Sequence, residues 1–311
     1  MSFRFHDDPD AREELWSEVH EACLISFPDD KRGRIAHPPV MSRPRITTLE
    51  DGTRIHCIRA QEARVLDQHT SGYLTHGIAL TDNATVFDVG ANVGVFAVRA
   101  VQRHPGTRVF AFEPIPPIRA ALEANAALHG EGRIQTMPFG VGEDAGEFSF
   151  TYYPRSPALS TSDPGAWDQD PDALTEAVRG SIAEARHEFW YARLVPLAAA
   201  GLLARYLRGK SSAHTCQVRP LSEVIAENSV KHIDLLKVDC EGAELATLQG
   251  IAEDQWPTIQ QVVAEVHDRD GRLDTVTALL SSKGFDRIEI VAEPGFEATP
   301  LRNVHASRRT P

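Results

Sequence analysis

The residues with the clearest chemical meaning stand in a glycine-rich turn. Asp88 is followed by Gly90-Ala91-Asn92-Val93-Gly94, between an apolar run and a segment with helical spacing. Glycines at such a junction let the backbone bend tightly and let a ligand approach the amino end of the helix. The dinucleotide fingerprint G-x-G-x-x-G is not met, because Asn92 and Val95 occupy its second and third glycine positions. A carboxylate at position 88 suits a ligand with an ammonium group and repels a pyrophosphate, so an NAD-dependent oxidoreductase is disfavoured.

A second acidic residue, Glu113, ends the next apolar run, 19 residues beyond Gly94. A carboxylate at that place in a nucleotide-binding fold accepts hydrogen bonds from both hydroxyls of an unphosphorylated ribose. The two features together predict an adenosine-type ligand without a 2′-phosphate.

A third group of polar residues follows two later strand-like runs. They are Asp239, Glu241 and Glu244 after the run at 233–238, and Glu265 and His267 at the end of the run at 259–266. Because the carboxyl ends of parallel strands face the ligand crevice, we expect these side chains to converge beside the glycine turn. Two plainer interpretations stay open: Glu241 and Glu244 as acids favoured at a helix start, and His267 as a surface histidine at a strand end.

Alternating strands and helices must bring these groups together, and the sequence has that rhythm. Continuous apolar runs, typical of parallel strands buried on both faces, predict strands at 85–89, 108–112, 134–141, 233–238, 259–266 and 285–291. Helical spacing predicts helices at 62–76, 95–102, 116–129, 221–227, 243–250 and 273–283, and turn residues predict hairpins at 45–58 and 147–153. This order implies parallel pairing and a doubly wound α/β fold.

The chain divides into two parts. Residues 1–45 have the composition of an N-terminal extension with a linker, and residues 46–311 form the α/β domain. The rhythm stops at 154–215, and 173–208 within that stretch resembles two apolar helices. We expect this insertion to cover the carboxyl edge of the sheet as a lid, since such folds bind ligands there. Its apolar side chains either line a tunnel for a greasy acceptor or pack on one another and on the sheet.

The composition is that of an acidic globular protein. The 311 residues include 44 Asp and Glu against 32 Lys and Arg, so the formal net charge is −12. That balance argues against a duplex nucleic-acid partner, whose binding needs a basic surface. The four cysteines form no CxxC pair, which leaves a zinc ribbon unsupported, and the longest apolar run, 194–204, is too short for a membrane span. We therefore expect a cytoplasmic protein with no membrane span and no nucleic-acid partner.

Together these stretches resemble the S-adenosylmethionine-dependent methyltransferases, and within them the FkbM type. The resemblance covers roughly residues 45–309 and rests on the segments at 86–94, 112–114, 233–244, 265–267 and 303–306. It implies a Rossmann-like class I methyltransferase fold, in which a doubly wound, mostly parallel seven-stranded sheet carries a helical lid insertion. It also implies S-adenosylmethionine as the methyl donor and O-methylation of a hydroxyl on a secondary metabolite, such as a polyketide, peptide or sugar-bearing intermediate.

Further segments, at 152–157 and 160–161, resemble FkbM domains found with polyketide and nonribosomal-peptide assembly lines. The resemblance therefore implies a small-molecule or carrier-tethered acceptor. An N- or C-methyltransferase with the same donor site, and a non-catalytic scaffold that binds the donor, stay open as alternatives. The oligomeric state is open as well, a homodimer included.

The resemblance also assigns a donor site. Its expected residues are Tyr73, Asp88, Gly90, Ala91, Asn92, Gly94, Glu113, Pro114, Gly140 and Val141. Tyr73 either hydrogen-bonds the donor's carboxylate or packs in the core. The loop at 139–141 lacks the acidic residue that many methyltransferases use to bind the adenine amine, so a backbone contact is expected to replace it.

Methyl transfer needs an acceptor oxygen held in line with the methyl carbon and a base for its proton. We expect His267 to be the general base, with Asp239 and Glu265 orienting it or the acceptor hydroxyl. The same three side chains are also a candidate Mg²⁺ site, which would lower the pKa of the hydroxyl, and the sequence does not choose between the two schemes. Acceptor contacts are expected at Glu241, Tyr153 and Trp190.

Overall fold

The computed structural model describes residues 44–162, 175, 178–180, 182, 196–292 and 299–308. The expected extension at 1–45 lies outside these residues except for its last two positions, and so does a large part of the expected lid insertion. Within the described part, no helix is both long enough and apolar enough to cross a membrane.

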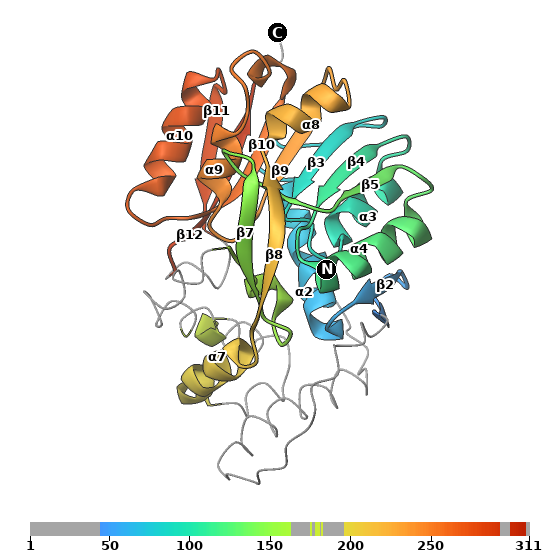
Figure 1. Ribbon diagram of the computed structural model, residues 1–311, viewed down its shortest axis with the longest axis vertical. Coiled ribbons are helices and arrows are strands. Elements are labelled where there is room, and N and C mark those ends of the chain that lie inside the picture. Colours follow the sequence, from blue (N-terminus) through green and yellow to red (C-terminus); the bar gives the residue numbers. More distant parts are fainter. Residues whose placement is uncertain are drawn as a thin grey trace.

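A seven-stranded sheet forms the centre of the molecule (Figure 1). Its strands, in the order in which they pair, are β11 (Arg287–Val291), β12 (Leu301–Ser307), β10 (Gln261–His267), β9 (Leu235–Val238), β3 (Thr85–Val89), β4 (Arg108–Phe112) and β5 (Ile134–Met137). β12 runs antiparallel to both of its neighbours, and the other pairs are parallel. The prediction of a Rossmann-like, doubly wound and mostly parallel seven-stranded sheet is confirmed.

The buried strands supply two hydrophobic cores, one on each face of the sheet. Val86 of β3 packs in a core with α3 (Val95–Arg103) and α4 (Pro116–His129). Its neighbour Phe87 packs in a second core with α8 (Leu221–Glu227), α9 (Glu244–Gln249) and α10 (Arg272–Ser282). Every residue of β3 is buried, which explains why the sequence shows a continuous apolar run there instead of alternation.

The expected strand at 134–141 is in fact two strands in different sheets. β5 ends at Met137, and β6 (Gly140–Val141) pairs with β8 (Ser212–Arg219) outside the main sheet. Pro138 lies between them and has no N–H to donate to a strand partner, so the ladder of β5 stops there.

The second sheet consists of β6, β8 and β7 (Gly146–Tyr152), and it carries the insertion. β7 pairs antiparallel with β8, from Gly146 opposite Val218 to Tyr152 opposite Ser212. The expected hairpin at 147–153 is therefore wrong, because β7 pairs across the insertion with a segment that was not predicted as a strand. In Figure 1 the β7–β8 ribbon extends away from the main sheet toward α7 (Ala200–Arg208).

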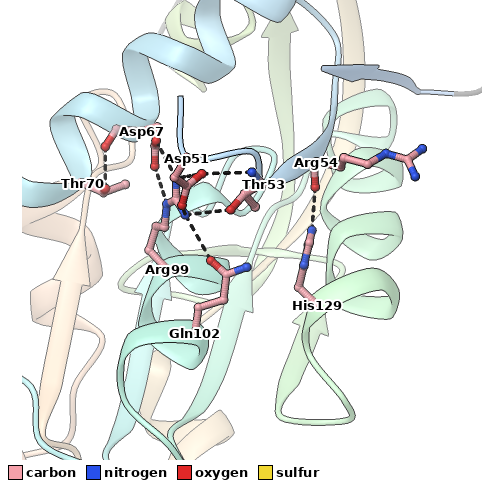
Figure 2. Close-up of polar contacts among 8 residues, drawn as sticks. All are labelled: Asp51, Thr53, Arg54, Asp67, Thr70, Arg99, Gln102 and His129. Atoms are coloured by element: carbon pink, nitrogen blue, oxygen red, sulfur yellow. Dashed lines mark hydrogen bonds and ion pairs between the residues drawn. The ribbon is translucent and has the colours of Figure 1, made fainter. Parts of the chain in front are cut away.

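The expected hairpin at 45–58 is present as β1 (Arg45–Thr48) and β2 (Arg54–Cys57). A buried arginine ties it to α2 (Ala60–Tyr73) and α3, as Figure 2 shows. The Arg99 guanidinium donates to both carboxylate oxygens of Asp67 on α2, at 2.6 and 2.7 Å, and to Asp51 in the turn of the hairpin at 2.6 Å. This network fixes α2, the helix that ends at Tyr73.

Candidate active site

A cavity of about 620 Å³ lies at the carboxyl ends of β3, β4, β9 and β10. Residues of α2, of the β7–β8 ribbon and of the segment at 157–162 complete its walls. The expected site residues that line it are Tyr73, Gly90, Ala91, Asn92, Glu113, Pro114, Gly140, Val141, Asp239, Glu241, Glu265 and His267. The expected donor and catalytic groups thus meet in one cavity.

Three of the expected residues that the structure describes are not part of the cavity wall. Asp88, Gly94 and Tyr153 are described but do not line it, and Trp190 lies outside the described residues. Tyr153 packs instead with Val178, Ile182, Ala200 and Ala204 of the insertion. The described part of the insertion therefore supports mutual packing of its apolar side chains.

The glycine turn requires glycine at two positions, for different reasons. Gly90 has a φ of 74°, and a Cβ there would overlap the carbonyl oxygen of Asp239 on the neighbouring strand end. Gly94 has a φ of 85°, directly precedes α3 and packs against Leu122 of α4. Asn92 also has a positive φ, 50°, which asparagine tolerates better than most residues. The turn therefore brings the backbone at 90–92 to the cavity, while Gly94 packs behind it.

Asp88 lies beneath the turn. Its side chain is fully buried, and its Oδ1 is 3.0 Å from the Nζ of Lys237 on the neighbouring strand β9. The expectation that Asp88 contacts a ligand's ammonium group gains no support from this position, because Lys237 supplies the ammonium group instead. Sequence reasoning missed Lys237, although a lysine inside an apolar strand is a signal: lysine is almost never fully buried without a partner.

Tyr73 and Asp239, which both line the cavity, are joined by a hydrogen bond. The Tyr73 hydroxyl donates to Asp239 Oδ2 at 2.9 Å, and the Lys237 ammonium lies 3.4 Å from the same oxygen. The Tyr73 ring also packs edge-on against Phe96, with centroids 5.7 Å apart. Tyr73 therefore packs in the core, which is one of the two expected roles, and it also lines the cavity, where its hydroxyl is bound to Asp239.

Glu113 is a buried carboxyl group at the end of β4. It is 5% exposed, and its Oε1 accepts the backbone N–H of Ile115 at 2.8 Å. Burial raises the pKa of Glu113 to about 8, against the opposing effect of that hydrogen bond. The hydroxyls of a ligand bound here would therefore meet a carboxyl group that ionises near pH 8.

The cavity also holds acidic residues that sequence reasoning missed. Glu143 and Asp144 line it directly beyond the loop at 140–142, although no acid was expected on that side. Glu62 lines it from α2 and accepts the backbone N–H of Ala158 at 2.6 Å, and burial raises its pKa to about 7. The signal for the first two was present in the sequence, since they follow Val141 by only two and three residues.

His267 ends β10 and is 9% exposed. Its Nε2 lies 3.5 Å from Glu241 Oε2, and its Nδ1 lies 3.7 Å from Glu244 Oε1. Glu244 is fully buried at the start of α9, where it also accepts the backbone N–H of Gly242 at 2.6 Å. Glu244 is thus a helix-start acid, as the plainer interpretation had it, and a histidine partner as well.

These contacts and the burial of the side chains shift the pKa values of His267 and Glu241. Burial lowers the pKa of His267, but the nearby carboxylates of Glu244 and Glu241 outweigh burial, so the pKa lies above its usual value. Burial raises the pKa of Glu241 to about 8, even though His267 opposes that rise. Glu241 also has a φ of 53°, and strained backbone of this kind clusters at functional sites. The three residues form a coupled acid–base group at the cavity wall.

The structure gives the expected magnesium site no support. Among the described residues, no group of three or more His, Cys, Asp or Glu side chains is arranged to hold a metal ion. Asp239 in particular contacts Lys237 and Tyr73.

The chain was compared with known proteins. Residues 88–287 match the family described as "Methyltransferase FkbM domain". A relative from Streptomyces tacrolimicus, "31-O-demethyl-FK506 methyltransferase FkbM", is 38% identical over 268 residues, which are 84% of this chain and 96% of that protein. "Methyltransferase sdnD" of Sordaria araneosa is 31% identical over 67% of this chain and 75% of its own length.

Another relative is far longer than this chain. "AMB antimetabolite synthetase AmbE" of Pseudomonas aeruginosa is 34% identical over 84% of this chain, which spans only 12% of that protein. The family match covers the glycine turn, Glu113 and the His267 group, and it begins at Asp88. The chain therefore belongs to the FkbM family and is an S-adenosylmethionine-dependent methyltransferase.

Proposed function

We propose that this enzyme methylates a hydroxyl oxygen of a natural-product acceptor. The observation that carries the proposal is that His267 lies in the wall of the cavity that also contains the glycine turn, with Glu241 of the same wall and the fully buried Glu244 as its carboxylate neighbours. An alcohol is a poor nucleophile near neutral pH, so a positioned base is what oxygen methylation needs from the protein.

The residues of the turn fit the donor. The Glu113 carboxyl suits the two ribose hydroxyls, and Gly140 and Val141 suit the adenine, with Glu143 and Asp144 as candidate partners of its amine. A side chain at position 90 would overlap the carbonyl oxygen of Asp239 and so displace the turn. S-adenosylmethionine supplies a methyl group on a sulfonium, and the acidic lining of the cavity favours that positive charge.

The order of the strands separates a donor half from an acceptor half. β4, with Glu113, neighbours β3 on one side, whereas β9 and then β10 follow on the other. Neighbouring strands are about 4.8 Å apart, so the end of β10 is roughly 10 Å from the glycine turn. We infer that the nucleoside lies over β3 to β5 and that the acceptor hydroxyl approaches over β9 and β10, beside His267.

His267 would then take the proton of the acceptor hydroxyl at Nε2. The buried Glu244 carboxylate lies 3.7 Å from Nδ1, where its charge favours an N–H and so leaves the Nε2 lone pair for the acceptor. Asp239 and Glu265 were expected to orient either His267 or the acceptor hydroxyl. The contacts of Asp239 are with Tyr73 and Lys237, so we propose that both carboxylates orient the acceptor hydroxyl.

The names of the relatives agree with an oxygen acceptor and with natural products. The Streptomyces relative is named for 31-O-demethyl-FK506, a compound that lacks a methyl group on oxygen, and AmbE is named as an antimetabolite synthetase. A natural-product acceptor with a free hydroxyl, free in solution or tethered to a carrier, is therefore the first choice.

The test is a transfer assay with isotope-labelled S-adenosylmethionine. The purified chain is incubated with 31-O-demethyl-FK506 and with a panel of hydroxylated polyketides and peptides, both free and carrier-bound. FK506, which already carries that O-methyl group, is the matched control for the first compound. A labelled product whose fragmentation places the methyl on oxygen supports the proposal.

Two other results would replace it. A methyl group on nitrogen or carbon would indicate an N- or C-methyltransferase with the same donor site. Tight binding of S-adenosylhomocysteine with no transfer to any acceptor, together with no effect of His267→Ala in the organism, would indicate a donor-binding scaffold.

A further inference from the structure

Lys237 is enclosed by oxygen atoms that belong to different elements. It is 3% exposed in β9, and its Nζ lies 3.0 Å from Asp88 Oδ1, 3.2 Å from the carbonyl oxygen of Gly90 and 3.4 Å from Asp239 Oδ2. The centroid of the Tyr73 ring is 5.3 Å from the same nitrogen. Burial lowers the pKa of Lys237, but Asp88 and Asp239 outweigh burial, so the ammonium group stays charged.

Neutralising the buried Asp88 would require only the first of these contacts. The second and third are with groups of the cavity wall, because Gly90 and Asp239 both line it. An ammonium group has three N–H donors, and the surrounding oxygens match that number. Lys237 therefore connects the donor-side turn after β3 with the carboxylate after β9.

The backbone around this contact leaves little room for adjustment. The backbone N–H of Asp239 donates to the carbonyl oxygen of Val89 at 3.0 Å, and the Asp239 carbonyl lies directly against Gly90. Because Lys237 contacts both the Gly90 carbonyl oxygen and the Asp239 carboxylate, a shift of its ammonium group would move these two groups relative to each other. Tyr73, which donates to the same carboxylate oxygen of Asp239, would lose its fixed partner.

We propose that Lys237 is a positioning residue that ties the glycine turn to Asp239 and thereby sets the affinity for the methyl donor. This role rests on donor binding at the turn and is independent of the acceptor's identity.

The test uses two variants, Asp88→Asn and Asp88→Asn/Lys237→Met. Lys237→Met alone would leave a buried carboxylate without a partner and would destabilise the fold, whereas the double variant removes both charges together. Binding of S-adenosylhomocysteine is measured by calorimetry and the unfolding temperature by circular dichroism. We expect the double variant to bind about tenfold more weakly than Asp88→Asn, at a similar unfolding temperature, because charge-assisted hydrogen bonds to the wall are lost.

Equal affinities in the two variants would overturn the proposal, since Lys237 would then serve only to neutralise Asp88. If the double variant does not fold, Asp239→Asn gives a second test, because the Asp239 side chain is 19% exposed and its change leaves the Asp88–Lys237 pair intact. Weaker binding at an unchanged unfolding temperature supports the role of Lys237, and unchanged binding contradicts it. Failure of the unaltered chain to bind S-adenosylhomocysteine would refute the donor site itself, which is a separate outcome.

Discussion

Gly90 and Asp239 approach each other so closely across the ends of β3 and β9 that a Cβ atom at position 90 would overlap the Asp239 carbonyl oxygen. Gly90→Ala should therefore lose donor binding and destabilise the fold by about 3 kcal/mol, from the strained positive φ plus the overlap. Calorimetry with S-adenosylhomocysteine and urea unfolding measure the two effects.

Gly132→Ala is the matched control for that change. Gly132 also has a positive φ, 78°, but a Cβ there would meet no atom within 4 Å. The control should cost only the backbone strain, about 1 kcal/mol, and should keep donor binding. Similar losses in both variants would show that the contact with Asp239 does not matter.

Donor binding should depend on pH through Glu113. Its pKa is about 8 in the free protein, so the carboxyl is mostly protonated at pH 7, whereas the ionised form accepts the ribose hydroxyls better. Affinity for S-adenosylhomocysteine should thus rise as the pH increases through about 8, and binding at pH 7 should release a proton. Calorimetry in buffers of different ionisation enthalpy detects that proton.

Glu113→Gln should abolish the Glu113 part of this pH dependence. The amide keeps the shape of the side chain but does not titrate, and we expect affinity above pH 8 to fall about tenfold. The same proton release and the same slope in the variant would mean that another group titrates on binding.

The rate of methyl transfer should rise with pH through a pKa above 6.5, the ordinary value for histidine. His267 must be neutral to accept a proton, and Glu244 and Glu241 stabilise its protonated form. Glu244→Gln should therefore move the acidic limb of the rate profile to lower pH, because the buried carboxylate no longer favours the charged imidazole. A profile that does not move would rule out Glu244 as the partner of the base.

His267→Ala should lower the rate by about 10²- to 10⁴-fold, which is the usual contribution of a general base. The affinity for S-adenosylhomocysteine should change much less, because in the sheet β9 separates β10 from β3, whose glycine turn is the proposed donor site. Single-turnover measurements with saturating donor separate the two quantities. A rate close to that of the unaltered enzyme would assign the proton to another residue.

The fold could be predicted from the sequence wherever local pattern and burial agree. β3 and β4 are continuous apolar runs because both of their faces are covered, and α8 begins and ends at the predicted residues. β8 could not be predicted in the same way. Only Cys216 and Val218 of its eight residues are buried, and its partner β7 lies beyond the insertion.

The candidate site could be predicted at the level of strand ends but not of partners. The topology brings Glu113, Asp239 and His267 to one cavity, as the order of strands implied. Which carboxylate pairs with which basic group depends on where each side chain points. Several such groups lie within about 4.8 Å, the distance between neighbouring strands, so the sequence does not decide between them. The sequence could not show that His267 pairs with Glu241 of the loop after β9 and with Glu244 at the start of α9, or that Asp88 pairs with Lys237.

Removal of divalent metal should leave methyl transfer unchanged. The described residues contain no group of three or more His, Cys, Asp or Glu side chains arranged to hold an ion, and the proposed proton acceptor is His267. Turnover in excess EDTA should equal turnover in excess Mg²⁺. A rate that falls in EDTA and returns with added Mg²⁺ would restore the magnesium scheme that the sequence left open.

Arg99→Met should destabilise the protein by about 3–5 kcal/mol, because it leaves the carboxylate of Asp67, 16% exposed, without its partner. The matched control is Asp51→Asn, which removes the more exposed partner of the same guanidinium, 53% exposed, and should cost about 1 kcal/mol or less. Arg99 holds the pKa of Asp51 well below its usual range, so the Asp51 carboxylate stabilises the unaltered protein at pH 7 and less so as acid protonates it. Asp51→Asn should lack this contribution at every pH. Urea unfolding at pH 7 and at pH 3 measures both effects.

Since α2 carries Tyr73 to Asp239, Arg99→Met should also weaken S-adenosylhomocysteine binding. Unchanged binding in a destabilised variant would show that α2 keeps its place without this network.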